Sequence, residues 1–205
     1  MPRLSPSQKR DLEVATAGYQ GNLNLAEEYL AGRGIDLDAA ARYRLGVVLD
    51  PYSGHETGRG RLAIPYLTKA GVVTIRFRAM DGAKPKYLTL PGGGTRLYNT
   101  AALHEAGQTI WICEGEFDAL VTTEYAGLPA VGICGANVWA PFWGRIFADF
   151  DEVVIASDGD EAGAAMADRL MGHIPHARRA PLPENHDCNS FYLERGADEL
   201  RAALC

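Results

Sequence analysis

The chain has few cysteines, and their spacing suggests neither a zinc site nor a disulfide framework. Its 205 residues contain four cysteines, which are Cys113, Cys134, Cys188 and Cys205. No two of them form a CxxC pair, and no histidines accompany them at the spacing of zinc ligands. We therefore expect free thiols in an intracellular protein, and no zinc.

Long apolar runs are also missing. No stretch of about 18 apolar residues is present, so the sequence predicts no membrane-spanning helix and no membrane partner. The first residues, MPRLSPSQKRDLE, carry charges without the apolar segment of a secretory signal. A cytoplasmic location is the resulting expectation. The hydrophobic content of 47% is enough for a buried core in one large domain or two small ones.

Charge is distributed unevenly along the chain. The formal net charge is −6, but residues 59–96 carry eight basic residues and one acid, whereas residues 97–205 carry six basic residues and 17 acids. One basic block and one acidic block suggest a polyanion bound by the first and metal ions by the second. The alternative is two ordinary solvated faces.

The order of predicted elements indicates an α/β protein. Residues 22–45 favour short helices, and residues 61–90 contain three β-rich segments separated by turns. From about residue 108, strands alternate with helices, which predicts a Rossmann-like, mostly parallel sheet with helices on both faces. We place a basic mixed α/β domain at 1–105 and the parallel-sheet domain at 106–205.

One strand of the first domain is rich in arginine. Alternation along residues 72–80 puts apolar side chains on one face and Arg76 and Arg78 on the other, with Lys84 and Lys86 in the loop that follows. Arginines on a strand are often simply solvated. Their concentration here favours a binding face.

Three carboxylates follow two apolar strands of the second domain. Glu114 comes directly after residues 110–113, and Asp158 and Asp160 come after residues 153–156. Ligands bind at the carboxyl edge of parallel sheets, and like charges gathered there raise one another's pKa unless Mg²⁺ or Mn²⁺ compensates. Taken singly, each acid could be an ordinary residue at the start of a helix.

The combination resembles the Toprim domain. That family pairs a strand-end glutamate, here Glu114 in EGEFDAL, with an Asp-x-Asp motif after a later strand, here Asp158 and Asp160. A glycine-containing strand end lies between the two motifs, and GICGAN around Gly135 matches it. The resemblance implies a metal-dependent enzyme acting on nucleic acid.

In detail the sequence is most similar to the bacterial DnaG-type primases. Their E-G-x-x-D pattern is met by Glu114, Gly115 and Asp118, and their D-x-D-x-A-G pattern by residues 158–163. A later Leu-Pro…Asp motif is matched by Leu182, Pro183 and Asp187. Where that family has a second aspartate after this motif, the chain has Asn189, which puts a metal role beyond Asp187 in doubt.

The resemblance extends upstream, from about residue 22 to residue 195. YLAGRGIDLDAAARYRLGVV resembles the helical entry of the primase RNA polymerase core, and RLAIPYLTKAGVVTIRFRAM and KPKYLTLPG resemble its basic β-subdomain. The segment RLYN resembles the connection to Toprim. By this likeness, the residues lining the path of template, nucleotide or primer are Arg76, Arg78, Lys84, Lys86 and Arg96.

The resemblance implies a DNA primase catalytic core that makes short RNA primers on single-stranded DNA from ribonucleoside triphosphates with Mg²⁺ or Mn²⁺. Glu114, Asp158 and Asp160 would hold metal, with Asp118 and Asp187 as supporting acids; Glu116 is expected on the surface. The zinc-binding and helicase-binding domains of the family are not recognised. We therefore expect a compact, phage-type protein in the host cytoplasm, with a separate helicase or zinc-binding primase subunit as a partner.

Two alternatives remain. A Toprim nuclease would use the same acids to cleave DNA, and a regulatory module would bind nucleic acid after losing activity. Retention of Glu114 and of both aspartates of the Asp-x-Asp motif speaks mildly against the second.

Overall fold

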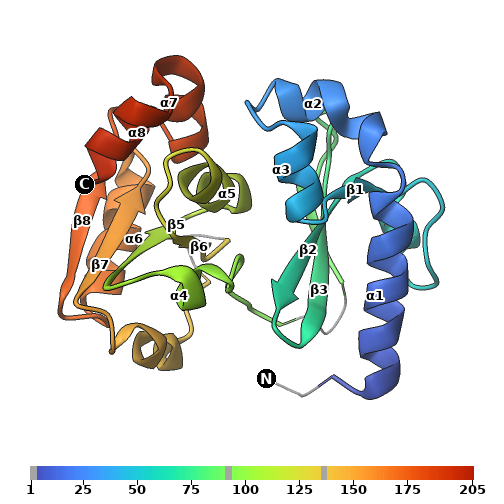
Figure 1. Cartoon of the computed structure of the whole chain (residues 1–205), viewed down its shortest axis with the longest axis horizontal. Coiled ribbons are helices and arrows are strands. Elements are labelled where there is room, and N and C mark those ends of the chain that lie inside the picture. Colours follow the sequence, from blue (N-terminus) through green and yellow to red (C-terminus); the bar gives the residue numbers. More distant parts are fainter. Residues whose placement is uncertain (1–3, 91–93, 135–137) are drawn as a thin grey trace. The chain divides into compact units, whose positions relative to one another are not determined.

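The computed structural model describes residues 4–90, 94–134 and 138–205. The chain divides into two compact units, residues 1–94 and residues 95–205. Each unit has its own sheet (Figure 1). The boundary between the units lies between Gly94 and Thr95, before the predicted boundary at residues 105 and 106. Among the residues described, none of the helices combines the length and the apolar character needed to cross a membrane.

The first unit contains a four-stranded antiparallel sheet in the order β1-β2-β3-β4. Its strands are β1 (Gly46–Val47), β2 (Leu62–Thr68), β3 (Gly71–Arg78) and β4 (Tyr87–Thr89). Its helices are α1 (Pro6–Gln20), η1 (Leu23–Ala26), α2 (Glu27–Ala31), α3 (Leu37–Arg42) and η2 (Glu56–Gly58).

Helix α1 covers one face of this sheet. It starts at a capping box, in which the Ser5 side chain accepts from the Gln8 amide and the Gln8 side chain accepts from the Ser5 amide. One stripe of the helix, including Leu12 and Tyr19, is buried against Ile75 and Phe77 of β3. The predicted apolar face of this strand is therefore present at Ile75 and Phe77. It is interrupted near the start of the strand, where a register shift against β2 puts Val72 in the cluster in place of Val73.

The second unit contains a parallel sheet in the order β6-β5-β7-β8. Its strands are β5 (Thr109–Cys113), β6 (Ala130–Gly132), β7 (Glu152–Ser157) and β8 (Ala177–Pro181). Its helices are α4 (Ala102–Glu105), α5 (Glu116–Glu124), η3 (Pro141–Phe147), α6 (Glu161–Met171), α7 (Cys188–Arg195) and α8 (Ala197–Leu204).

Helices cover both faces of the parallel sheet, as the sequence predicted. Residues of α4, η3 and α6 form one core with Ile110, Ile112 and Ile155 of the central strands. On the opposite face, the Trp111 indole N–H donates to the Leu204 carbonyl of α8 at 3.2 Å. Because both faces are buried, the central strands β5 and β7 are mostly apolar, whereas the edge strand β8 carries Arg178 and Arg179.

Two local features complete the second unit. The aromatic segment around Trp143 forms the 3₁₀-helix η3, in which Trp143 and Phe147 are buried while Phe142 is exposed. The C-terminal segment forms two helices, because Gly196 has a φ of 88° and separates α7 from α8. Backbone in this left-handed region ends a helix and is most accessible to glycine.

Candidate active site

The two strands that precede the predicted acids are direct neighbours. Strand β5 pairs with β7 in parallel, with Cys113 opposite Ala156. Glu114 and Asp158 therefore leave the same edge of the sheet side by side. The backbone N–H of Asp158 lies 3.4 Å from Oε1 of Glu114 and donates to it. The strand order assumed from the sequence is confirmed here.

Asp118 joins these acids from the first turn of α5. Its side chain is buried, with 8% of its surface exposed. Its Oδ1 accepts from the backbone N–H of Asn189 at 3.0 Å, which ties the start of α5 to the start of α7. A side chain on Gly115 would meet Oδ2 of Asp118 at 2.5 Å, so the glycine leaves room for this carboxylate.

Asp160 and Asp187 are the N-caps of α6 and α7. Oδ1 of Asp160 accepts from the Gly163 amide at 2.7 Å, and Oδ1 of Asp187 accepts from the Ser190 amide at 2.6 Å. The structural explanation considered from the sequence, that such acids begin helices, is therefore correct for both. Capping engages one oxygen of each carboxylate and is compatible with a second role for the other.

Two glycines allow the loops of the site to pack closely. A Cβ on Gly159 would lie 1.9 Å from the Pro183 carbonyl oxygen, and one on Gly163 would lie 2.9 Å from Oε1 of Glu114. The Gly159 amide also donates to the His186 carbonyl at 2.8 Å. The Asp-x-Asp turn is thus held against the segment that leads to Asp187.

The acids repel one another in a partly desolvated site. Burial, then the charges of Asp118, Glu114 and other acids, raises the pKa of Asp158 to about 8. Burial and the charge of Asp187 raise the pKa of Asp118 to about 7, against the effect of the Asn189 amide. Burial is also the main cause of the raised pKa of Glu114. The site therefore disfavours full ionisation unless a cation compensates.

The donor chemistry of this cluster fits a hard divalent ion. Carboxylate oxygens are the ligands that Mg²⁺ prefers, and raised pKa values are expected where a cation belongs. Within the residues that the structure describes, no group of three or more aspartate, glutamate, histidine or cysteine side chains is arranged so that it could hold a metal ion as it stands. Ligation therefore requires the carboxylates to turn toward a shared ion.

Two neighbours of the cluster were not anticipated. Glu116, expected on the surface, is buried with 1% of its surface exposed, because the first turn of α5 packs inside the unit. Its charge contributes to the raised pKa of Asp118. Asn189, which stands where the resembling family has an aspartate, is buried as well.

The remaining sequence features of this unit are structural. All four cysteines are free, as expected, and Cys113 and Cys188 are buried in the core beside Thr122. Gly135 lies outside the described residues.

The predicted basic face of the first unit is organised by tyrosines. Arg78 is buried, with 4% of its surface exposed, so the alternative of a simply solvated arginine does not hold at this position. The binding role of this face stays a prediction. Its Nε donates to the Tyr29 hydroxyl at 2.5 Å, and its Nη1 donates to the hydroxyl of Tyr87, its cross-strand partner on β4. These bonds fix the guanidinium in place. Tyr87 is the tyrosine of the KPKY segment, and the sequence pattern does not predict its hydrogen bond with Arg78.

Three other predicted cations lie in the same unit as Arg78. The Arg76 guanidinium is 4.3 Å from the centre of the Tyr87 ring, and Lys86 Nζ is 5.9 Å from that centre. Lys84 and Lys86 are exposed. Arg96 belongs to the second unit, where burial lowers its pKa. The structure thus gathers Arg76, Arg78 and Lys86 around Tyr87.

Known proteins resemble this chain over both units. A family described as Toprim-like matches residues 111–192, which is less than half of the chain. The Gene 57 protein of Mycobacterium phage D29 is 43% identical over 147 residues, covering 69% of this chain and 96% of that protein.

Bacterial primases are more distant relatives. The DNA primase of Haemophilus influenzae is 27% identical, over 97% of this chain and 42% of that protein, so the chain spans less than half its length. The RNA polymerase domain of Mycobacterium tuberculosis primase DnaG, solved in complex with double-stranded DNA, superposes with a TM-score of 0.80. It is 23% identical, with 98% of this chain and 80% of that chain covered, which shows a shared fold.

Proposed function

Because the chain belongs to a family of compact, phage-type, primase-like proteins with a Toprim domain, we propose that it synthesises RNA primers on single-stranded DNA. The Gene 57 protein of Mycobacterium phage D29 is a member of this family. The observation that carries the proposal is the convergence of Glu114, Asp118 and Asp158 at one sheet edge, in the pattern of the primase core fold. Bacterial DNA primases are its distant relatives.

The acids would share the work of nucleotidyl transfer. Glu114, Asp158 and Asp160 would hold Mg²⁺ or Mn²⁺, with Asp187 beside them. The chemistry such an ion supplies is neutralisation of the phosphate charge and activation of the attacking hydroxyl. No protein nucleophile is required, because the primer 3′-hydroxyl or the initiating nucleotide attacks the incoming triphosphate.

Two carboxyls have further roles in this proposal. Glu114 is half-buried and has a raised pKa, which suits its carboxylate to accept the proton that leaves the attacking hydroxyl. Asp118 has a positioning role. Its Oδ1 accepts a hydrogen bond from the Asn189 amide and so positions the turn that carries Asp187. Burial suits Asp118 to this supporting role.

The cations of the first unit would bind the nucleic acid. Arg76 and Lys86 lie against the Tyr87 ring, and Arg78 is fixed by two phenol oxygens. An ordered guanidinium such as that of Arg76 binds phosphate oxygens well. Arg78 is buried and would contribute by holding Tyr29 and Tyr87 in place. Lys84 and Arg96 are proposed to contact the template or the nucleotide.

The direct test uses a single-stranded template, labelled ribonucleoside triphosphates and Mn²⁺. The wild-type chain should extend primers, and Asp158→Ala should lose the activity while remaining folded. Asp168→Ala, which removes an exposed acid from α6, is the matched control and should be fully active. Full synthesis by Asp158→Ala would disprove the assignment. Cleavage of labelled DNA without ribonucleotide incorporation would instead identify a nuclease, and tight DNA binding with neither reaction would identify a regulatory module.

A further inference from the structure

An open pocket lies on the first unit. Its volume is about 460 Å³, and it is lined by Leu25, Glu28, Tyr29, Gly32, Arg33 and Met80. Cavities that hold ligands of nucleotide size begin at about 300 Å³. Leu25 comes from η1, Glu28 and Tyr29 come from α2, and Gly32 and Arg33 follow α2 directly. Met80 comes from the segment after β3.

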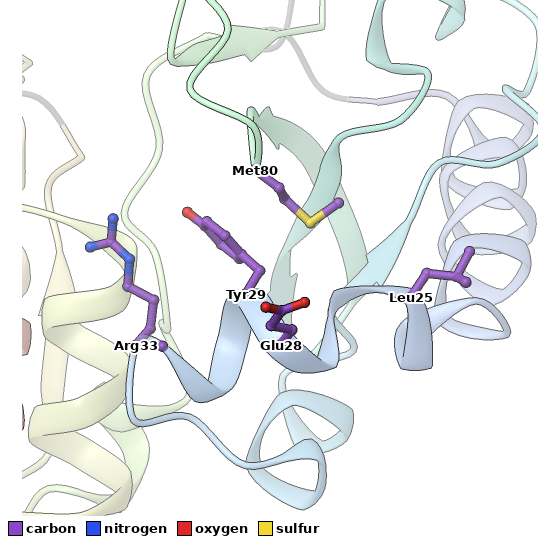
Figure 2. A pocket seen from close by; sticks show the side chains of 6 residues that line it. Leu25, Glu28, Tyr29, Arg33 and Met80 are labelled. Atoms are coloured by element: carbon purple, nitrogen blue, oxygen red, sulfur yellow. The ribbon is translucent and has the colours of Figure 1, made fainter.

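Apolar and aromatic groups form the walls. Figure 2 shows Met80 facing Tyr29 across the pocket, with Leu25 to one side. Leu25 is 56% exposed, so its side chain is accessible to a ligand in the pocket. A planar ring and a thioether are well suited to contact the face of a flat heterocycle.

The Tyr29 ring is held in place before any ligand arrives. Its hydroxyl accepts from Nε of Arg78 at 2.5 Å, and the guanidinium of Arg33 lies 5.8 Å from the centre of the ring. A fixed aromatic ring loses little conformational entropy on binding. The bond to Arg78 also connects the pocket directly to the proposed nucleic-acid face.

Two charged side chains line the pocket, Glu28 and Arg33, and Glu28 supplies the hydrogen-bond acceptor. Its carboxylate lies at the pocket between Tyr29 and Leu25 (Figure 2). A carboxylate is an acceptor with two oxygens, so it pairs best with two adjacent N–H donors. Among the common nucleobases, guanine presents such a pair, the N1–H and the exocyclic amine. Adenine and cytosine place an acceptor nitrogen beside their amine, which would face the carboxylate unfavourably.

We propose that this pocket binds one guanine base, with its ring against Tyr29, Met80 and Leu25 and its donor edge on the Glu28 carboxylate. The inference rests on the proposed function, because a nucleobase ligand is expected beside a face that binds nucleic acid. It adds a base preference that Arg76, Arg78 and Lys86 do not supply, since cations on phosphates do not distinguish sequences. The guanine can belong to a free nucleotide or to single-stranded DNA.

Binding is measured in EDTA, so that the acidic site contributes nothing through metal. Equilibrium dialysis compares GMP with AMP, and fluorescence anisotropy compares a labelled oligo-dT carrying one central dG with the same strand carrying dA. We expect about a tenfold preference for guanine, the size expected for a bidentate contact. Preference in both assays indicates a site that reads DNA, and preference for GMP alone indicates a free-nucleotide site.

Two variants isolate the role of Glu28. Glu28→Gln should abolish the preference for guanine over adenine. Glu27→Gln removes the same charge from the neighbouring residue of α2, which does not line the pocket, and should keep the preference. Met80→Ala should weaken the binding of guanine and of adenine without changing the ratio of the two affinities. This ratio is the decisive measurement, because a merely structural defect would weaken the binding of both bases alike.

Equal affinity for the two bases, or an unchanged preference in Glu28→Gln, would overturn the inference. Its failure is distinguishable from failure of the proposed function, because primer synthesis by the wild-type chain is measured separately. Synthesis without guanine preference removes only the pocket assignment. Guanine preference without synthesis removes only the proposed activity.

Discussion

The backbone N–H of Asp158 donates to the Glu114 carboxylate over 3.4 Å, although the two residues are 44 positions apart in the chain. This bond joins the ends of two neighbouring parallel strands at the centre of the acidic cluster. It also lowers the pKa of Glu114, in opposition to burial and to the charge of Asp160. The ionisation of the site therefore depends on the repulsion among its carboxylates and on the charge of any cation that it binds.

The first prediction concerns pH and metal. The pKa values of Asp118 and Asp158 are raised to about 7 and about 8, whereas the unfolded chain gives aspartate about 3.9. The folded state therefore keeps protons that the unfolded state has lost, so the acids' contribution to stability falls as pH rises from about 4 to about 8. Without divalent metal, the melting temperature should decrease over this range, and Mg²⁺ should restore it at pH 8.

Thermal unfolding at several pH values, with EDTA or with Mg²⁺, measures this effect. Asp158→Asn is the informative variant, because the amide removes one repelling charge at constant size. It should be more stable than wild type at pH 8 in EDTA and should gain less from Mg²⁺. A wild-type melting temperature that does not respond to Mg²⁺ at pH 8 would contradict the metal assignment.

The second prediction concerns the close approach at Gly159. Gly159→Ala forces a Cβ into the Pro183 carbonyl oxygen, which it would meet at 1.9 Å. We expect a loss of about 2 kcal/mol or more in the free energy of unfolding, together with loss of activity, because the Asp-x-Asp turn must move. Gly18→Ala in α1 is the control, since its Cβ meets nothing within 4 Å. It should be neutral or stabilising by about 0.5–1 kcal/mol in urea unfolding.

The third prediction concerns Arg78. Lysine keeps the charge but cannot reach both the Tyr29 and Tyr87 hydroxyls with a planar fork. Arg78→Lys should therefore weaken DNA binding, and Arg76→Gln should lower the slope of log K against log salt by about 1. Salt titrations of oligonucleotide anisotropy measure both. Arg10→Gln, on the exposed surface of α1, should change neither, and an equal effect there would indicate nonspecific charge attraction.

The fourth prediction concerns His55 in the first unit. Its Nδ1 is 2.8 Å from the Tyr19 hydroxyl, and aromatic contacts surround its ring. Burial lowers its pKa, with a smaller opposing effect of Glu56. The unfolded state takes up a proton near pH 6.5 before the folded state does, so this contribution to stability is lost as pH falls through that value. In urea unfolding, the stability of His55→Gln relative to wild type should therefore increase as the pH is lowered from 7 to 5.5. A difference that does not change with pH would exclude His55 as a pH-dependent contributor.

The sequence predicted the parallel sheet and its acidic edge well, for a physical reason. Residues 110–113 and 153–156 are uniformly apolar because both sheet faces are covered, and the carboxyl ends of parallel strands necessarily share one edge. Glu114 and Asp158 were therefore brought together by topology alone. The metal-binding and catalytic roles of these acids stay predictions.

The burial of a charged side chain was harder to predict than the face of the strand on which it lies. Alternation correctly separated Phe77 from Arg78, but it could not show that Tyr29 and Tyr87 would cover the guanidinium. Glu116 was misjudged for a related reason, since a charged residue in a first helical turn is usually solvated. Both errors depend on tertiary contacts between residues distant in sequence, which a periodic pattern does not contain.

Four carboxylates of the site accept a hydrogen bond from one backbone amide each: Glu114 from Asp158, Asp160 from Gly163, Asp118 from Asn189, and Asp187 from Ser190. Every acid in this set therefore has its own spectroscopic probe. In a ¹⁵N-labelled sample, a cation that binds one carboxylate would shift the resonance of the amide bonded to that carboxylate and leave the other amide resonances unchanged. Titration with Mg²⁺ would thus identify the ligands individually, without a single substitution.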